Sequence, residues 1–85
     1  MSHQVQILAR NAPGSLERIL RTVRVRGYAL CGLDVELDEA RGRYQLQLRV
    51  RGERPLDPLL RQLEKLVDVE QLLTLHAGAR EEAFA

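Results

Sequence analysis

The chain has 85 residues, of which 45% are hydrophobic and 29% charged, and its formal net charge is +1. This length allows one domain with a thin core, and the apolar content excludes an intrinsically disordered chain. The near balance of charge excludes a strong basic field, so neither nucleic acid nor an acidic membrane is an expected partner. Cys31, the single cysteine, has no internal disulfide partner, which indicates a reducing, cytoplasmic location. No apolar run approaches the ~18 residues of a membrane span.

The first predicted element is a strand over residues 4–10, where apolar and polar side chains alternate. A loop follows, with the sequence Asn11-Ala12-Pro13-Gly14. From Ser15, the predicted N-cap, an amphipathic pattern predicts a helix of about three turns that ends at Gly27. Its buried face is predicted to carry Leu16, Ile19, Leu20 and Val23.

The junction between this strand, loop and helix is the one place in the chain that suggests chemistry. Free backbone N–H groups would point into the loop, and the positive end of the helix dipole would favour a carboxylate there. The junction therefore indicates a ligand-sensing or regulatory module and not a catalyst. Asn11 and Gly14 also have an equally good structural explanation, since Asn forms Asx turns and Gly relieves backbone strain before a helix.

A hairpin is predicted next, with strands from residue 28 to 37 and from 43 to 51, joined at residues 38–42. In its first strand, the core face is assigned to Cys31, Leu33, Val35 and Leu37, and the other face to Leu30, Gly32, Asp34 and Glu36. In its second strand, the core face is assigned to Tyr44, Leu46, Leu48 and Val50. Cys31 is accordingly predicted to be buried. Ion pairs across the hairpin are predicted between Asp34 or Glu36 and the arginines Arg43, Arg49 and Arg51.

A second helix and a last strand complete the chain. Asp57 is predicted as the helix cap, followed by Pro58 at the first helical position. The apolar stripe of this helix is predicted to be Leu59, Leu60, Leu63, Leu66 and Val67. The strand from Val69 is predicted to turn Val69, Leu73 and Leu75 inward and Leu72 and Thr74 outward. Residues 1–76 then form a single domain, and residues 77–85 are predicted to be a disordered tail.

The order βαββαβ predicts an α+β fold, a ferredoxin-like sandwich with a four-stranded antiparallel sheet and two helices on one face. The first and third strands would lie at the centre of the sheet and the second and fourth at its edges. Since edge strands leave ladder groups unpaired, a homodimer built through edge strands is predicted.

Other functions found on this fold need residues that the chain lacks. A heavy-metal carrier needs a Cys-x-x-Cys pair in the first loop, and no metal site is predicted. An RNA-recognition module needs aromatic side chains on the open sheet face, whereas Tyr44 is assigned to the core. A small acyl-phosphate hydrolase would need Asn11 and Arg18, but Arg18 is predicted on the solvent side of its helix. No catalytic residue is predicted, and phosphate release by the isolated chain would support the hydrolase.

Several segments resemble those of ACT domains, and more specifically of the small regulatory subunits of acetohydroxyacid (acetolactate) synthase of the isozyme II type. The segments are Gln4-Val5-Gln6, Asn11-Ala12-Pro13-Gly14, residues 16–21, Arg26-Gly27-Tyr28 and residues 62–69. The resemblance extends from Gln4 to about Leu75. The last segment, Gln-Leu-Glu-Lys-Leu-Val-Asp-Val, and the short chain favour this subfamily.

The resemblance implies a cytoplasmic, non-catalytic subunit that binds and activates a catalytic large subunit in branched-chain amino acid biosynthesis. Thiamine diphosphate, Mg and FAD would all belong to that catalytic partner. Members of the family that respond to valine hold it between two ACT domains, which implies a ligand site formed by Asn11, Ala12, Pro13, Gly14, Ser15, Ala29 and Leu30. The alternative is a free-standing ACT-type amino-acid sensor that regulates another enzyme.

Ala29 departs from the pattern of these valine-binding members, which carry an Asn in the second strand at this position. Loss of that amide would leave polar groups of the ligand unpaired, at a cost of about 1–3 kcal/mol. Weak or absent binding of branched-chain amino acids is therefore expected.

Overall fold

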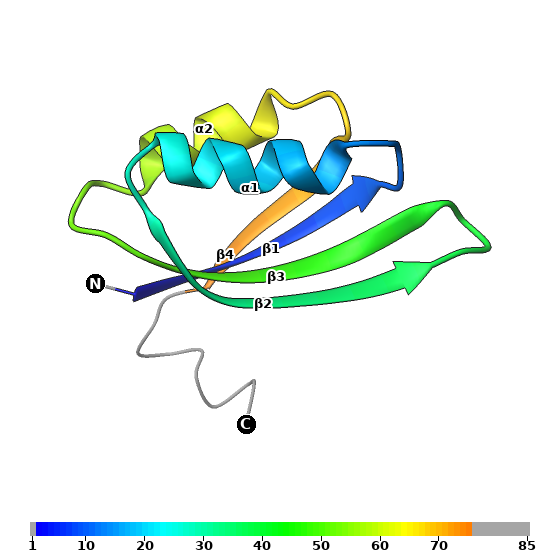
Figure 1. Ribbon diagram of the computed structural model, residues 1–85, viewed down its shortest axis with the longest axis horizontal. Coiled ribbons are helices and arrows are strands. Elements are labelled where there is room, and N and C mark those ends of the chain that lie inside the picture. Colours follow the sequence, from blue (N-terminus) through cyan, green and yellow to red (C-terminus); the bar gives the residue numbers. More distant parts are fainter. Residues whose placement is uncertain (1, 76–85) are drawn as a thin grey trace.

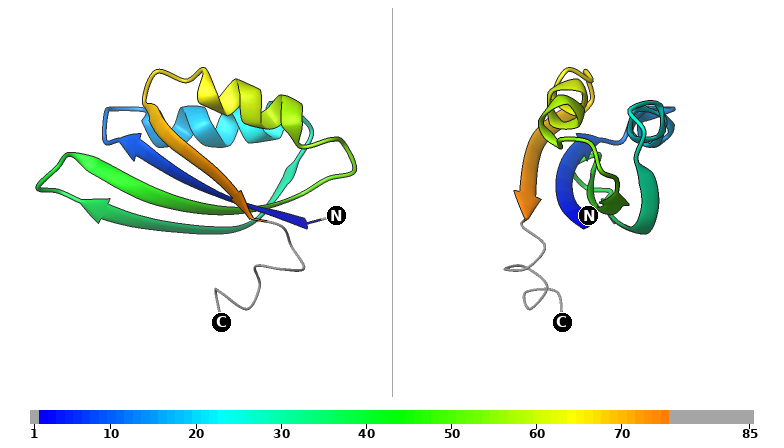
Figure 2. Two further views of the ribbon diagram at one scale, coloured as in Figure 1. Left: turned by 180° about the vertical axis from the view of Figure 1, so that it is seen from behind. Right: turned by 90° about the vertical axis from the view of Figure 1, so that its left-hand side faces the viewer.

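The computed structural model describes residues 2–75, so the tail predicted for residues 77–85 lies outside the described residues. The elements are β1 (Ser2–Arg10), α1 (Ser15–Val25), β2 (Ala29–Asp38), β3 (Arg43–Arg51), α2 (Asp57–Glu64) and β4 (Val69–Leu75). The strands form one antiparallel sheet in the order β2-β3-β1-β4, and both helices cover the same face (Figure 1, Figure 2). The predicted βαββαβ sandwich is confirmed, with β1 and β3 at its centre. Within residues 2–75, neither helix has the length and apolar character needed to cross a membrane.

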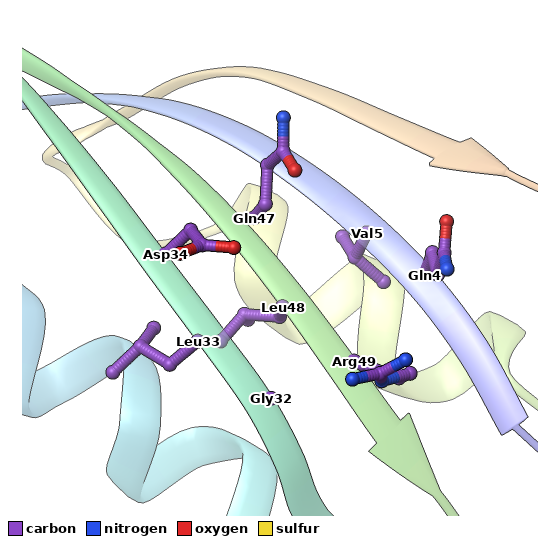
Figure 3. Close-up of a pocket in the computed structure, with 8 residues that line it drawn as sticks. All are labelled: Gln4, Val5, Gly32, Leu33, Asp34, Gln47, Leu48 and Arg49. Atoms are coloured by element: carbon purple, nitrogen blue, oxygen red, sulfur yellow. The ribbon is translucent and has the colours of Figure 1, made fainter. Parts of the chain in front are cut away.

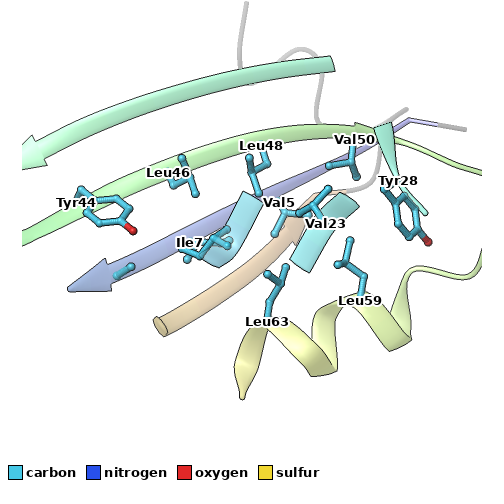
Figure 4. Close-up of a cluster of buried hydrophobic side chains, with 12 residues drawn as sticks. Val5, Ile7, Val23, Tyr28, Tyr44, Leu46, Leu48, Val50, Leu59 and Leu63 are labelled. Atoms are coloured by element: carbon cyan, nitrogen blue, oxygen red, sulfur yellow. The ribbon is translucent and has the colours of Figure 1, made fainter. Parts of the chain in front are cut away.

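The core lies between the sheet and the two helices (Figure 4). β1 and β3 each bury every second side chain, and α1 and α2 bury one stripe each, as their periodicities predict. The buried apolar residues are Val5, Ile7, Ala9, Ile19, Val23, Tyr28, Tyr44, Leu46, Leu48, Val50, Leu59 and Leu63. The predicted faces of β1, α1 and β3 are confirmed, since Leu16 and Leu20 also pack against this cluster.

In β4, Val69 packs against the core as predicted, but the faces predicted for Leu72 and Leu73 are wrong because a bulge changes the alternation after Val69. Leu8 pairs with Gln71 and Ala9 pairs with Val69, so Glu70 is an extra residue in the ladder. Leu72 consequently packs against the core, whereas Leu73 is 55% exposed on the other face.

The faces predicted for Leu30 and Cys31 in β2 are also wrong, because this strand contains a second bulge. Leu30 pairs with Val50 and Gly32 pairs with Arg49, so Cys31 is the extra residue and is exposed instead of buried. Leu30 therefore lies on the helix-side face together with three other apolar residues of β2. These are Leu33, Val35 and Leu37, which pair with Leu48, Leu46 and Tyr44 of β3. These side chains form what we call the β2 row: Leu30, Leu33, Val35 and Leu37, which are 40–47% exposed. No side chain of β2 is buried.

The ends of both helices differ from the prediction by small shifts. Gly14, and not Ser15, is the cap residue of α1, and Ser15 is the first helical residue. Similarly, Leu56 caps α2, so that Asp57 begins the helix and Pro58 follows. Val67 was assigned to the apolar stripe of this helix, but α2 ends at Glu64, so Val67 lies beyond the helix and is 81% exposed.

Candidate functional site

The loop between β1 and α1 is held closed by its own backbone. The N–H of Asn11 donates to the Gly42 carbonyl at 2.8 Å, and the N–H of Ala12 donates to the Arg10 carbonyl at 2.9 Å. The N–H of Ser15 donates to the Ala12 carbonyl at 3.1 Å. The predicted supply of free backbone donors is therefore smaller than the sequence suggested, because these three N–H groups already have acceptors. The bond to Gly42 also fixes the loop beside the β2–β3 connection.

Gly14 occupies a position that favours glycine. Its φ of 78° lies in the left-handed region, which side chains of other residues disfavour. The position of a Cβ atom there would also lie 3.1 Å from Nη1 of Arg18. Gly14 thus serves both to turn the backbone and to leave room for the Arg18 guanidinium.

Arg18, in the first turn of α1, was predicted on the solvent side of its helix, and its side chain is 49% exposed, but its guanidinium also contacts the loop. Its Nη2 donates to Oδ2 of Asp68 at 2.6 Å and to the Pro13 carbonyl at 3.4 Å. Asp68 is buried, and its own carbonyl accepts the Arg10 N–H at 2.8 Å. A cation therefore lies over the loop, anchored to the chain just before β4. The signal in the sequence is spacing, because a side chain in a helix leans toward the preceding turn, here toward Gly14.

Ser15, one of the residues predicted to form the ligand site, makes a structural contact. Its buried hydroxyl is hydrogen-bonded to the Tyr44 hydroxyl at 2.7 Å, which fixes the first turn of α1 on β3. Burial raises the pKa of Tyr44, and its hydrogen bond with Ser15 and the charge of Arg18 oppose that rise. The Ser15 hydroxyl is consequently engaged within the fold.

Ala29 and Leu30 do not lie beside the loop within one copy of the chain. They begin β2, at the opposite end of α1 from Asn11 and Gly14 (Figure 1). Both are exposed, as are Asn11, Pro13 and Gly14, while Ala12 is half-buried. The predicted site residues thus fall into two separate groups.

The ion pairs predicted across the hairpin are absent from the described part of the chain. Nε of Arg43 instead donates to Oε1 of Glu70 in β4 at 2.5 Å. This hydrogen bond and charge lower the pKa of Glu70 and raise the pKa of Arg43. Within residues 2–75, no cluster of His, Cys, Asp and Glu side chains has the arrangement of a metal site.

Comparison with known proteins identifies the family of the chain. Residues 11–72 match the family model of the ACT domain. Over 69 residues the chain is 42% identical to the acetolactate synthase isozyme 2 small subunit of Escherichia coli (strain K12), covering 81% of this chain and 79% of that protein. The chain belongs to the acetolactate synthase small-subunit family. It is thus a homologue of small regulatory subunits, which are non-catalytic.

Three further proteins are similar to this small-subunit homologue, one in sequence and two in fold. It is 33% identical over 72 residues to the chloroplastic acetolactate synthase small subunit 2 of Arabidopsis thaliana, covering 84% of this chain and 15% of that protein. The acetolactate synthase small subunit of Thermotoga maritima has the same fold, with a TM-score of 0.79 at 23% identity, over 94% of this chain and 50% of that chain. The ACT domain of a GTP pyrophosphokinase from Chlorobium tepidum also shares the fold, with a TM-score of 0.76 at 14% identity, over 88% and 97% of the two chains.

Proposed function

We propose that this chain is a cytoplasmic regulatory subunit that binds and activates a catalytic subunit of acetolactate synthase in branched-chain amino acid biosynthesis. The observation that carries the proposal is the 42% identity to the E. coli small subunit, which extends over four-fifths of both chains. The chemistry would belong to the catalytic partner, which would hold the thiamine diphosphate, Mg and FAD. This chain would contribute binding and regulation.

The working unit in this proposal is a homodimer formed through β2. β2 is an edge strand, so one side of its backbone has no neighbouring strand in the sheet. The β2 row lies along the same strand on the helix side and is 40–47% exposed. A second copy would pair with the free backbone and cover the row at the same time, which would bury apolar surface at about 25 cal/mol per Å².

The dimer would also unite the two halves of the amino-acid site. If two β2 strands pair antiparallel with Val35 facing Val35, Leu33 lies opposite Leu37, and Ala29, beyond the bulge at Cys31, lies near the connection after Asp38 in the other copy, which contains Arg41. Arg41 adjoins Gly42, whose carbonyl accepts the Asn11 N–H. The start of the second copy's β2 would therefore approach the loop at Asn11, which a single copy keeps at a distance.

Binding of a branched-chain amino acid at this composite site would be weak. Arg18 supplies a positive charge over the loop for the ligand carboxylate, although its guanidinium is shared with Asp68. The opposing position is Ala29, which offers a methyl group and no hydrogen bond. On this basis Ala29→Asn would increase valine binding about tenfold, equivalent to about 1.4 kcal/mol.

Titration calorimetry with valine tests the composite site. Gly14→Asp is expected to abolish binding because its carboxylate would compete with the ligand for Arg18. Gly14→Asn is the matched control, since Asn also tolerates positive φ but carries no charge. Tight binding by the unmodified chain, or no gain in Ala29→Asn, would contradict this account of the site.

Reconstitution tests the regulatory function itself. The full chain is mixed with a cognate acetolactate synthase catalytic subunit, and acetolactate formation is measured with and without it. We expect a higher rate with the chain and no acetolactate from the chain alone. Equal rates in both mixtures would contradict the proposal. The free-standing sensor would be favoured if the chain bound an amino acid but did not co-purify with the catalytic subunit.

A further inference from the structure

The face of the sheet opposite the helices carries several amide side chains. Pairing in the ladder places Gln6 opposite Gln47, Leu8 opposite Gln45, and Leu8 opposite Gln71 on the other side. Charges lie around these amides, with Asp34 and Glu36 on β2 and Arg49 on β3. Because both helices pack on the other face, this face lies open (Figure 2).

A hollow of about 320 Å³ lies on this face over β3, close to Leu48. This volume is at the lower end of the range of about 300–1,000 Å³ for small-molecule sites. The hollow depends on Gly32, because a Cβ atom at that position would lie 3.0 Å from Nη2 and 3.3 Å from Nε of Arg49. The missing side chain lets the Arg49 guanidinium lie against the backbone of β2.

Four polar side chains around the hollow are Gln4, Asp34, Gln47 and Arg49 (Figure 3). In the figure, the carboxylate of Asp34 points toward β3 on one side, while Arg49 and Gln4 lie further along the sheet. Asp34 pairs in the ladder with Gln47 and Arg49 pairs with Gly32, so the two charges are diagonal neighbours on one face.

The polar groups of this hollow are largely unused by the fold. Oε1 of Gln4 is buried without a hydrogen-bond partner, the single such side-chain atom found in residues 2–75. Asp34 and Arg49 are opposite in charge and close in the ladder, but neither forms an ion pair with any described residue. An unpaired buried acceptor costs about 1–3 kcal/mol, so a donor that reached Gln4 would be favoured.

We propose that this hollow binds a free amino acid whose side chain carries a hydrogen-bond donor. The ligand carboxylate would pair with the Arg49 guanidinium, and its ammonium would donate to the Asp34 carboxylate and the Gln47 amide oxygen. The side-chain donor would reach Oε1 of Gln4, which is buried and unpaired, once the Gln4 amide turns toward the hollow. A zwitterion fits because the hollow presents one cation and one anion that are not paired with each other. The site lies on the face opposite Gly14 and Arg18, and it requires neither the dimer nor the regulatory function.

The test is an NMR titration of the isotopically labelled full chain with L-glutamine as the probe. We expect shifts of the backbone amides of Gly32, Asp34 and Arg49, with the loop at residues 11–15 unaffected. L-norvaline, which has the same head group but no side-chain donor, is expected to bind more weakly. Shifts confined to the loop, or no shifts up to tens of millimolar, would overturn the proposal.

Matched variants identify the groups that bind. Arg49→Gln and Asp34→Asn should each weaken glutamine binding about tenfold or more, because each removes a charge-assisted hydrogen bond. Arg51→Gln and Glu36→Gln remove the same charges from the same strands outside the hollow and should leave binding unchanged. Gln4→Leu should remove the preference for glutamine over norvaline. Equal loss in all four charge variants would overturn the proposal, since it would indicate a general effect of surface charge.

Discussion

β2 and β3 are the two strands of one hairpin, and both alternate apolar and polar residues, yet the apolar face of β3 is buried and that of β2 is exposed. The helix-side residues of β3, Tyr44, Leu46, Leu48 and Val50, are at most 3% exposed, whereas their partners in the β2 row are 40–47% exposed. Both helices lie on the same face of the sheet (Figure 2), but β3 lies between β2 and β1, whereas β2 is an edge strand with a neighbouring strand on one side only. The difference shows that β2 has the apolar alternation of a strand with a buried face, but that the rest of the chain leaves this face about half exposed.

The largest expected contrast is between Leu48 and its partner Leu33. Leu48→Ala would leave a cavity in a closed core and should lower the free energy of unfolding by about 2–5 kcal/mol. Leu33→Ala removes a half-exposed side chain and should change the stability of the monomer by less than about 1 kcal/mol. Denaturant unfolding at several protein concentrations measures both, since a dimer contact appears as concentration dependence. Similar losses at all concentrations would contradict the difference between the strands.

The next contrast is between Tyr44 and its partner Leu37. Tyr44→Phe removes the partner of the buried Ser15 hydroxyl and should lower the free energy of unfolding by about 1–3 kcal/mol. Adding Ser15→Ala should restore part of the loss, because neither polar group then remains unpaired. Leu37→Ala is the control at the edge and should have a smaller effect on the dilute monomer. The hydrogen bond would be unimportant if Tyr44→Phe unfolded at the same denaturant concentration as the unmodified chain.

The smallest effect concerns Arg43, whose ladder partner in β2 is Asp38. The bond from Arg43 lowers the pKa of Glu70, so its stabilising contribution is present above the ordinary Glu pKa and is lost as pH falls through the lowered value. Glu70→Gln should therefore flatten the acid side of a plot of melting temperature against pH. Asp38→Asn should leave that slope nearly unchanged. An unchanged slope in Glu70→Gln would show that the exposed pair contributes nothing measurable.

The sequence predicted the elements that follow a regular period and a short connection. The order of elements, the central strands and the core faces of β1, α1 and β3 all followed from periodicity, because each of these elements is covered along its whole length. The bulges at Cys31 and Glu70 could not be predicted from alternation, since one extra residue reverses the faces without changing the composition. They account for the wrong assignments of Leu30, Cys31, Leu72 and Leu73.

The candidate site was predicted less completely than the fold. The sequence identified Asn11 and Gly14, and Gly14 does have the positive φ that a glycine suggests. It did not reveal Asp68, because the contact between Arg18 and Asp68 joins residues 50 positions apart. Nor could it show that the hydroxyl of Ser15 faces Tyr44, which depends on how α1 lies on the sheet.

The mass of the chain in solution tests most directly whether a second copy covers the half-exposed β2 row. Light scattering at micromolar concentration should give the mass of a dimer for the unmodified chain. Val35→Lys, which places a charge in the middle of the β2 row, should give the mass of a folded monomer. Gln71→Lys, on the other edge strand and the open face, should remain a dimer. A monomer mass for the unmodified chain, or a dimer that survives Val35→Lys, would contradict the account.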